Sequence, residues 1–198
     1  MKMKGVFLYI VNMNSSCMSL EKMLSLINSV KCTIGGGGGA SGYPDIITSL
    51  AEIFTKVRYS RKQTYFIGNG GSAAIAVHMT ADYFKRGRMR TLSLYDISLI
   101  TCLANDYGYE YVFSKQIERL SETGDLLVAI SSSGKSQNII NAIEAAKSIG
   151  VQVMSLTGFE PDNPVRKISD YSVYVPCNEY GPVESIHNLI LQQVVDML

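Results

Sequence analysis

Short apolar runs alternate with longer amphipathic stretches from residue 63 to the end of the chain. The apolar runs are nearly continuous and rich in β-branched residues, which is typical of strands that are buried on both faces of a parallel sheet. They predict strands at residues 64–67, 90–94, 126–130, 152–156 and 171–175. The amphipathic stretches predict helices at residues 73–84, 97–104 and 137–148 and from about residue 183 onward. This alternation predicts an α/β fold whose parallel sheet is covered by helices and binds ligands at the carboxyl ends of its strands.

Residues 1–42 follow a different pattern. Ser19 is a favourable N-cap, and the apolar residues after it have helical spacing. Five consecutive glycines at 35–39 then interrupt all regular structure, and we interpret them as a flexible linker or mobile surface loop. A second helix fits residues 44–57. We therefore expect an N-terminal extension with a helix and a Gly-rich linker at 1–42, and a single domain at 43–198.

The composition is that of an ordinary folded protein. Its 198 residues are 46% hydrophobic and 18% charged, with a formal net charge of +1. This balance provides no basic surface for nucleic acid, and no apolar run reaches the length of a membrane-spanning helix. The four cysteines are scattered without a Cys-x-x-Cys pair, which argues against a zinc ribbon or a disulfide framework. We therefore expect a cytoplasmic protein whose partners are small molecules or other copies of the chain.

A glycine-rich turn follows the first predicted strand. Asn69, Gly70, Gly71 and Ser72 come directly after the apolar run, and the next predicted helix begins at Ala73. Glycine lets backbone N–H groups approach a ligand closely, and a helix N-terminus adds partial positive charge. We interpret the turn as an anion site, most often used for phosphate, with a plain strand-to-helix turn as the alternative.

A second loop of this kind follows the strand predicted at 126–130. Ser131, Ser132 and Ser133 precede a glycine, and Ser136 comes just before the next predicted helix. Serine hydroxyls and helix-start N–H groups together form a second anion cradle. The alternative is a serine-rich N-cap, but four serines in six residues exceed what a cap needs. The spacing differs from that of a Walker P-loop.

Together, these motifs resemble those of a known family. The sequences GNGGSA at 68–73 and ISSSGKS at 130–136 are similar to the two loops that characterise the sugar isomerase (SIS) domain family. The segments at 103–108, 123–127 and 155–158 are similar to the branch that contains the phosphoheptose isomerases. The resemblance covers approximately residues 43–198.

The resemblance implies a fold, an assembly and a ligand. The implied fold is a three-layer αβα sandwich with a five-stranded parallel sheet and a leading helical hairpin, assembled as a homotetramer. The implied ligand is a phosphorylated sugar, with no nucleotide cofactor. Its phosphate would lie in the serine loop, and Asp96 falls where family members place a polar group near the sugar. The implied substrate-binding residues are Asn69, Gly70, Gly71, Ser72, Asp96, Ser131, Ser132, Ser133, Ser136 and Glu184.

The acid–base residues of the branch are only partly matched. In phosphoheptose isomerases, a histidine and a glutamate on one helix and a glutamine and a histidine on the last helix bind zinc. That glutamate and the second histidine also act as the acid–base pair. The resemblance carries these four positions onto His78, Asp82, Glu184 and Gln192. Asp82 thus replaces the glutamate, Glu184 replaces the glutamine, and Gln192 replaces the second histidine.

Two interpretations of this altered set remain open. In the first, Asp82 or Glu184 is the enolising base, and zinc or another divalent cation bound with His78 polarises the carbonyl. In the second, the domain is not catalytic and only binds a phosphosugar or a protein partner in a regulatory or assembly role. We favour an isomerase that acts on sedoheptulose 7-phosphate for heptose-containing surface polysaccharide, such as lipopolysaccharide or capsule. The reason is that carboxylates occupy both key helical positions. His187 lies among apolar residues and is expected to be structural.

Overall fold

Five neighbouring strands of the sheet are parallel, and all five predicted strands are confirmed. The computed structural model describes residues 18–35, 38–40 and 42–198 of the chain. Within these residues the sheet has seven strands in the order β2-β1-β7-β6-β5-β3-β4. The parallel strands are β3 (Gln63–Gly68), β4 (Arg90–Leu92), β5 (Leu126–Ser131), β6 (Gln152–Thr157) and β7 (Tyr171–Tyr174).

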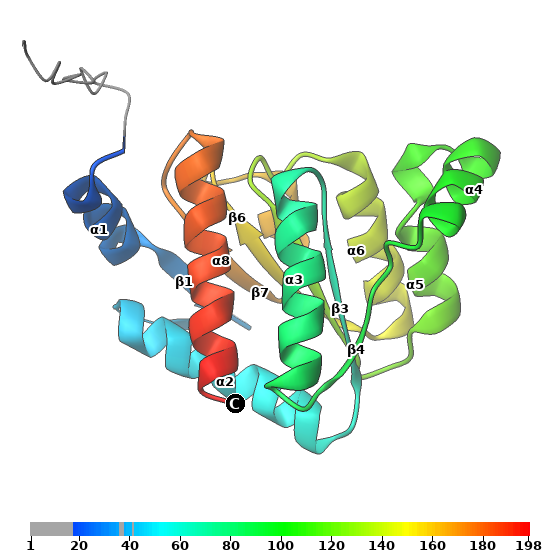
Figure 1. Ribbon diagram of the computed structural model, residues 1–198, viewed down its shortest axis with the longest axis horizontal. Helices are drawn as coiled ribbons and strands as arrows, with labels where there is room; N and C mark the ends of the chain where they lie inside the picture. Colours follow the sequence, from blue (N-terminus) through cyan, green and yellow to red (C-terminus); the bar gives the residue numbers. More distant parts are fainter. Residues whose placement is uncertain (1–17, 36–37, 41) are drawn as a thin grey trace, which may run out of the picture.

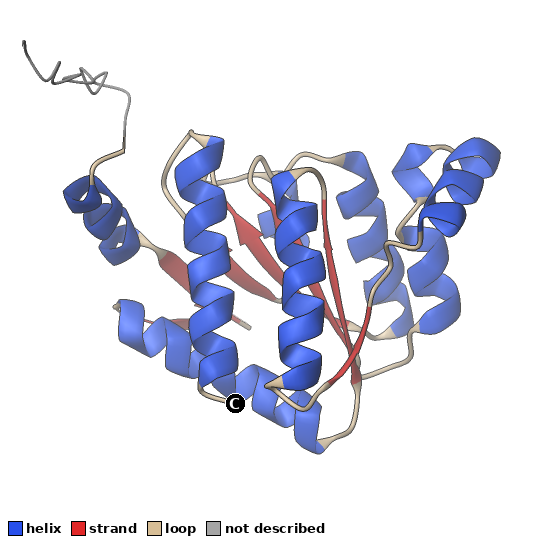
Figure 2. Cartoon of the chain, in the orientation of Figure 1, coloured by secondary structure: helices blue, strands red, loops and turns tan. Residues whose placement is uncertain are grey.

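Helices cover both faces of this sheet, as the alternating pattern predicted. Successive strand residues point to opposite faces, so Phe66 packs in one core while Tyr65 and Ile67 pack in the other. The first core is closed by α2 (Tyr43–Tyr59), α3 (Gly71–Lys85) and α8 (Tyr180–Asp196). The second is closed by α4 (Ile97–Tyr107), α5 (Ser114–Leu120), α6 (Gln137–Ile149) and α7 (Pro164–Ile168). Figure 2 shows the strands enclosed between these helices, and the fold is therefore an αβα sandwich.

The N-terminal part adds two antiparallel strands that the sequence did not predict. After α1 (Leu20–Ser29), β1 (Lys31–Ile34) pairs with β7, the last of the parallel strands, and β2 (Gly38–Ala40) pairs with β1. The implied helical hairpin is thus wrong, because two strands separate α1 from α2. The glycine run was also expected to interrupt all regular structure, yet Gly38 and Gly39 lie in β2. Extended backbone can pair without side chains, and pairing with β1 supplies its hydrogen bonds. Residues 1–17, 36–37 and 41 lie outside the described residues.

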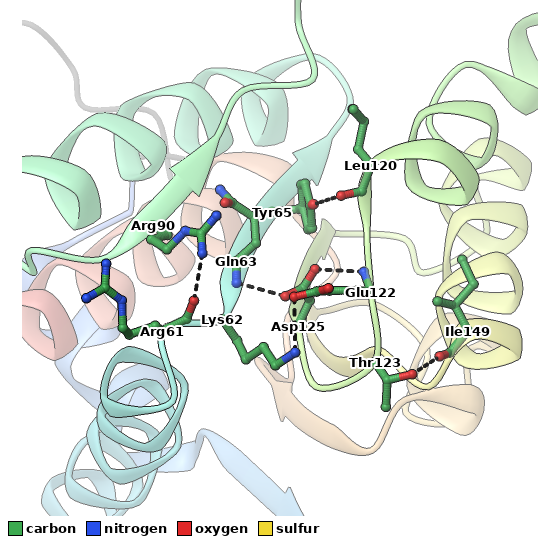
Figure 3. Close-up of polar contacts among 10 residues, drawn as sticks. All are labelled: Arg61, Lys62, Gln63, Tyr65, Arg90, Leu120, Glu122, Thr123, Asp125 and Ile149. Atoms are coloured by element: carbon green, nitrogen blue, oxygen red, sulfur yellow. Dashed lines mark hydrogen bonds and ion pairs between the residues drawn. The ribbon is translucent and has the colours of Figure 1, made fainter.

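The amino ends of β3 and β5 are joined by one buried carboxylate. Asp125, in the turn before β5, is 1% exposed and accepts hydrogen bonds from the backbone N–H groups of Gln63 (2.8 Å) and Glu122 (2.9 Å) (Figure 3). The Tyr65 hydroxyl donates to the carbonyl oxygen of Leu120 (2.6 Å) in the same region. Asp125 therefore ties the start of β3 to the loop that leads into β5.

We expect replacement of Asp125 by alanine to lower the free energy of unfolding by about 2 to 4 kcal/mol. The substitution leaves two N–H groups without their charged acceptor at a buried position. Urea unfolding of Asp125→Ala checks this. The control is Glu144→Ala on the exposed side of α6, which we expect to stay within about 0.5 kcal/mol of the parent. Equal effects of the two substitutions would contradict the assigned role.

Candidate functional site

A cavity of about 330 Å³ opens at the carboxyl ends of the parallel strands. Gly68 and Ile130 are register partners in the adjacent strands β3 and β5, so the loops that follow these two strands meet at one point. Every predicted substrate-binding residue except Asp96 lines the cavity. Its lining residues are Asn69, Gly70, Gly71, Ser72, Ile130, Ser131, Ser132, Ser133, Ser136, Tyr180 and Glu184.

Three helices begin at this cavity. Figure 1 shows the amino ends of α3, α6 and α8 at the same edge of the sheet. Among the described residues, none of the three helices has a side-chain cap, so first-turn N–H groups stay available to a ligand. Aligned helix dipoles add partial positive charge there. The cavity is therefore suited to an anionic group, although the described residues that line it include no lysine or arginine.

The glycine turn is packed too closely for side chains. A Cβ atom on Gly68 would lie 2.7 Å from the backbone of Ser72, and a Cβ atom on Gly71 would take the space that the carboxylate of Glu184 now occupies. Gly70 has a φ of +55°, in the left-handed region that favours glycine. The carboxylate of Glu184 thus lies directly against the start of α3.

The serine loop is fixed by neighbouring backbone and by α7. Gly134 has a φ of +62°, and a Cβ atom there would lie 2.0 Å from Oδ1 of Asn163. The Gly134 N–H donates to the carbonyl oxygen of Ser131 (3.0 Å), and its carbonyl oxygen accepts from Val165 (3.1 Å). The hydroxyl of Ser132 is buried and has no hydrogen-bond partner among the described residues. A fixed loop with an unpartnered hydroxyl at the cavity is suited to an external acceptor such as phosphate.

A buried histidine is linked to the serine loop through hydrogen bonds at the end of β6. His187 donates through Nε2 to the carbonyl oxygen of Thr157 (3.1 Å), at the end of β6. The next N–H along the chain, that of Gly158, donates to the carbonyl oxygen of Ser132 (2.8 Å). One peptide group therefore links His187 to the serine loop. Desolvation lowers the pKa of His187 to about 4, against a smaller opposing effect of the Thr157 carbonyl, so the ring is neutral at pH 7.

Two residues of the site that the sequence did not indicate are Asn138 and Tyr109. Asn138, in the first turn of α6, exchanges two hydrogen bonds of 2.9 Å with the side chain of Asn69. The hydroxyl of Tyr109, in the 3₁₀ turn η1 (Tyr109–Tyr111), donates to Oδ1 of Asn69 (2.9 Å). Tyr180, which also lines the cavity, was missed as well. Of these three residues, Asn138 alone lies next to a predicted binding loop, because it follows Ser136 by two residues.

Asp96 does not line the cavity. It is exposed and is the N-cap of α4, accepting a hydrogen bond from the backbone N–H of Leu99 (2.9 Å). The neighbouring Tyr95 contacts the glycine turn instead, because its hydroxyl accepts from the N–H of Gly68 (2.7 Å) and donates to the Gly68 carbonyl oxygen (2.8 Å). Asp96 as a substrate ligand therefore stays a prediction that this geometry does not support.

His78, Asp82 and Gln192 lie together on α3 and α8, outside the cavity lining. His78 Nε2 is 3.6 Å from Asp82 Oδ2. In the amide orientation that satisfies both of its ends, Gln192 donates to Asp82 (3.0 Å) and accepts from Nη1 of Arg86 (2.7 Å). Glu184 is eight residues before Gln192, about 12 Å along the helix axis.

These residues, as arranged, do not fit a divalent metal. The carboxamide oxygen of Gln192, its one atom that could coordinate a cation, is occupied by the guanidinium of Arg86. Glu184 lies against Gly71 and lines the cavity, whereas the other three side chains do not line it. In the part of the chain that the structure describes, no three His, Cys, Asp or Glu side chains are grouped to hold a metal ion. The predicted metal set of His78, Asp82, Glu184 and Gln192 is thus not assembled.

Comparisons with known proteins agree with this architecture. A family model described as the SIS domain matches residues 44–158. The chain is 36% identical over 156 residues to the phosphoheptose isomerase of Fusobacterium nucleatum subsp. nucleatum. This alignment covers 76% of this chain and 78% of that protein. It is 37% identical over 161 residues to the phosphoheptose isomerase of Shewanella sediminis, with coverage of 77% and 82%.

Two solved structures are similar over the same part of the chain. The phosphoheptose isomerase of Neisseria gonorrhoeae matches with a TM-score of 0.72 and 32% identity, covering 77% of this chain and 84% of that one. The enzyme of the same name from Francisella tularensis matches with a TM-score of 0.72 and 28% identity, covering 78% of this chain and 85% of that one.

In the described residues, no helix combines the length and apolar character needed to span a bilayer.

The buried histidine predicts acid sensitivity. A histidine in the unfolded chain has a pKa of about 6.5, whereas burial lowers the pKa of His187 in the folded protein to about 4. Between these two pH values the unfolded chain therefore binds more protons than the folded protein. The stability due to the neutral ring is complete above pH 6.5 and is lost as the pH falls toward 4. From pH 7.5 to 4.5 we expect the wild type to lose about 2.5 kcal/mol more unfolding free energy than His187→Gln, measured with urea. Parallel losses in the two proteins would contradict this.

Proposed function

We propose that this chain, which belongs to the SIS domain family and groups there with the phosphoheptose isomerases, interconverts a ketose phosphate and its aldose phosphate. Sedoheptulose 7-phosphate is the proposed substrate. The observation that carries the proposal is one cavity in which two anion-binding loops and one carboxylate meet. The heptose phosphate formed would supply the synthesis of surface polysaccharide, such as lipopolysaccharide or capsule.

The serine loop is proposed to bind the phosphate. Ser131, Ser132, Ser133 and Ser136 line the cavity together with the uncapped start of α6. Hydroxyl and backbone N–H donors are strong partners for phosphate oxygens because the acceptor carries charge. This places the sugar end of the ligand toward the glycine turn, the start of α3 and Glu184.

Glu184 is proposed to move the proton in the isomerisation. The carboxylate takes a proton from C1 of the ketose, which leaves an enediolate, and returns it to C2 while the hydroxyl proton at O1 passes to O2. Among the described residues that line the cavity, Glu184 is the one carboxylate. The N–H groups at the start of α3 and the side chain of Asn69 are the donors available to the developing negative charge.

Asp82 remains the other proposed catalytic carboxylate. Asp82 does not line the cavity, and its carboxylate contacts His78 and accepts a hydrogen bond from Gln192. The geometry therefore favours Glu184, and separate substitution of Glu184 and Asp82 distinguishes the two proposals.

No step is assigned to a zinc ion or another divalent metal, because the residues do not fit one in this arrangement. A nucleotide cofactor has no part in the proposal, since the redox change is internal to the sugar.

The proposed assembly is a homotetramer in the cytoplasm. Large apolar side chains are exposed on several elements, among them Leu20 (75%) on α1, Phe84 (65%) on α3 and Ile97 (77%) on α4. Contact between copies of the chain would cover such side chains. We propose 43–198 as the SIS domain and 1–42 as an extension to it, of which β1 joins the same sheet.

We expect Glu184→Gln to reduce turnover of sedoheptulose 7-phosphate by about 10²- to 10⁴-fold, as loss of a general base does. Solvent deuterium incorporation at C1 and C2, followed by NMR with and without zinc and with a chelator, measures the reaction. The control is Glu179→Gln, an exposed carboxylate just before the same helix. If Asp82→Asn abolishes exchange while Glu184→Gln keeps it, the proton transfer belongs to Asp82 instead.

We expect Ser133→Ala with Ser136→Ala to weaken binding of inorganic phosphate and sedoheptulose 7-phosphate by about 10- to 100-fold. Two charge-assisted hydrogen bonds are lost together. Titration calorimetry measures both ligands, and Ser148→Ala at the far end of α6 is the matched control. Undiminished affinity would exclude this loop as the phosphate site. Tight binding to the wild type without deuterium exchange would instead support a non-catalytic, regulatory or assembly role.

A further inference from the structure

The side chain of Asn69 has almost no hydrogen-bonding capacity left for a ligand. A carboxamide has one oxygen that accepts two hydrogen bonds and one nitrogen that donates two. Oδ1 of Asn69 accepts from Nδ2 of Asn138 (2.9 Å) and from the hydroxyl of Tyr109 (2.9 Å). Nδ2 of Asn69 donates to Oδ1 of Asn138 (2.9 Å). One N–H of Asn69 therefore remains, and no acceptor.

The partners that impose this state come from two different elements. Asn138 is 3% exposed and belongs to the first turn of α6, the helix that begins at the serine loop. Tyr109 belongs to η1, which is itself held to α6 by a hydrogen bond from Nδ2 of Asn141 to the carbonyl oxygen of Glu110 (2.9 Å). Both partners of Asn69 are thus joined to α6, the helix that begins at the loop proposed to hold the phosphate.

We propose that Tyr109 and Asn138 are positioning residues that hold Asn69 as a single hydrogen donor toward the C2 oxygen of the substrate. This inference rests on the proposed isomerase function. Asn69 lines the cavity beside the first N–H groups of α3, where the enediolate is proposed to form. An amide free to rotate presents its oxygen as readily as its nitrogen, and an oxygen repels a developing oxyanion. Fixing the amide in advance removes this unfavourable orientation and the cost of reorienting it during the reaction.

The hydroxyl of Tyr109 is the more direct of the two to test. Asn138 is buried, so its replacement also affects folding, whereas Tyr109 is half exposed and its hydroxyl donates a hydrogen bond to Asn69. Tyr109→Phe removes that hydroxyl and leaves the ring. Tyr111→Phe, in the same turn, is the matched control, because its hydroxyl makes no hydrogen bond with any described residue.

The experiment compares kcat, KM and ligand affinity in the wild type, Tyr109→Phe and Tyr111→Phe. We expect Tyr109→Phe to lower kcat for sedoheptulose 7-phosphate by about tenfold with little change in KM, which identifies an interaction made in the transition state. It should weaken a phosphorylated hydroxamate, which mimics the enediolate, by a similar factor and leave the affinity for inorganic phosphate unchanged. Tyr111→Phe should match the wild type in all four quantities.

The outcomes separate this inference from the proposed function. Unchanged kcat and hydroxamate affinity in Tyr109→Phe would overturn the positioning role. Equal weakening of hydroxamate and inorganic phosphate would also overturn it, because the tyrosine would then only support the shape of the loops. If the wild type shows no turnover, the proposed function fails. The hydroxamate-to-phosphate affinity ratio in the two variants then still decides whether Tyr109 orients Asn69.

Discussion

The site depends on the parallel pairing of β3 with β5. Both strands are buried on both faces, and their pairing places Gly68 opposite Ile130. A shift of one residue in this register would exchange the two faces of β3 and move Phe66 from one core to the other, at a large cost in buried apolar area. The hydrophobic core thus determines where the two loops begin. The geometry of the candidate site follows from core packing, in which none of the proposed catalytic residues takes part.

The other interactions of the site refine this placement. Asp125 anchors the amino ends of the two strands, and at the carboxyl ends Asn138 joins the helix after β5 to the loop after β3. His187 holds the end of β6 against the serine loop through one peptide group. Each of these polar side chains is buried and hydrogen-bonded, as desolvation requires. Together they tie the two loops that line the cavity to each other and to the sheet.

The sequence was informative where a local pattern determined the structure. Continuous β-branched runs predicted the five parallel strands, and the glycine and serine loops identified nearly all of the cavity lining. It failed where the partner is distant in the chain. Nothing near residue 31 indicates that β1 pairs with β7, and nothing near Tyr109 indicates a contact with Asn69. The described residues do not assemble the metal set for a similar reason, because helical spacing placed His78 beside Asp82 but could not show that Arg86 occupies the oxygen of Gln192.

The contact between Gly71 and Glu184 couples two positions that are far apart in the sequence. The carboxylate occupies the space that a Cβ atom at residue 71 would need. A side chain at position 71 would therefore displace the Glu184 carboxylate from its place beside the start of α3. Substitution of this glycine would act on the cavity through the rotamer of a residue much later in the chain. The missing side chain of Gly71 thus provides the space in which the one carboxylate among the described lining residues lies.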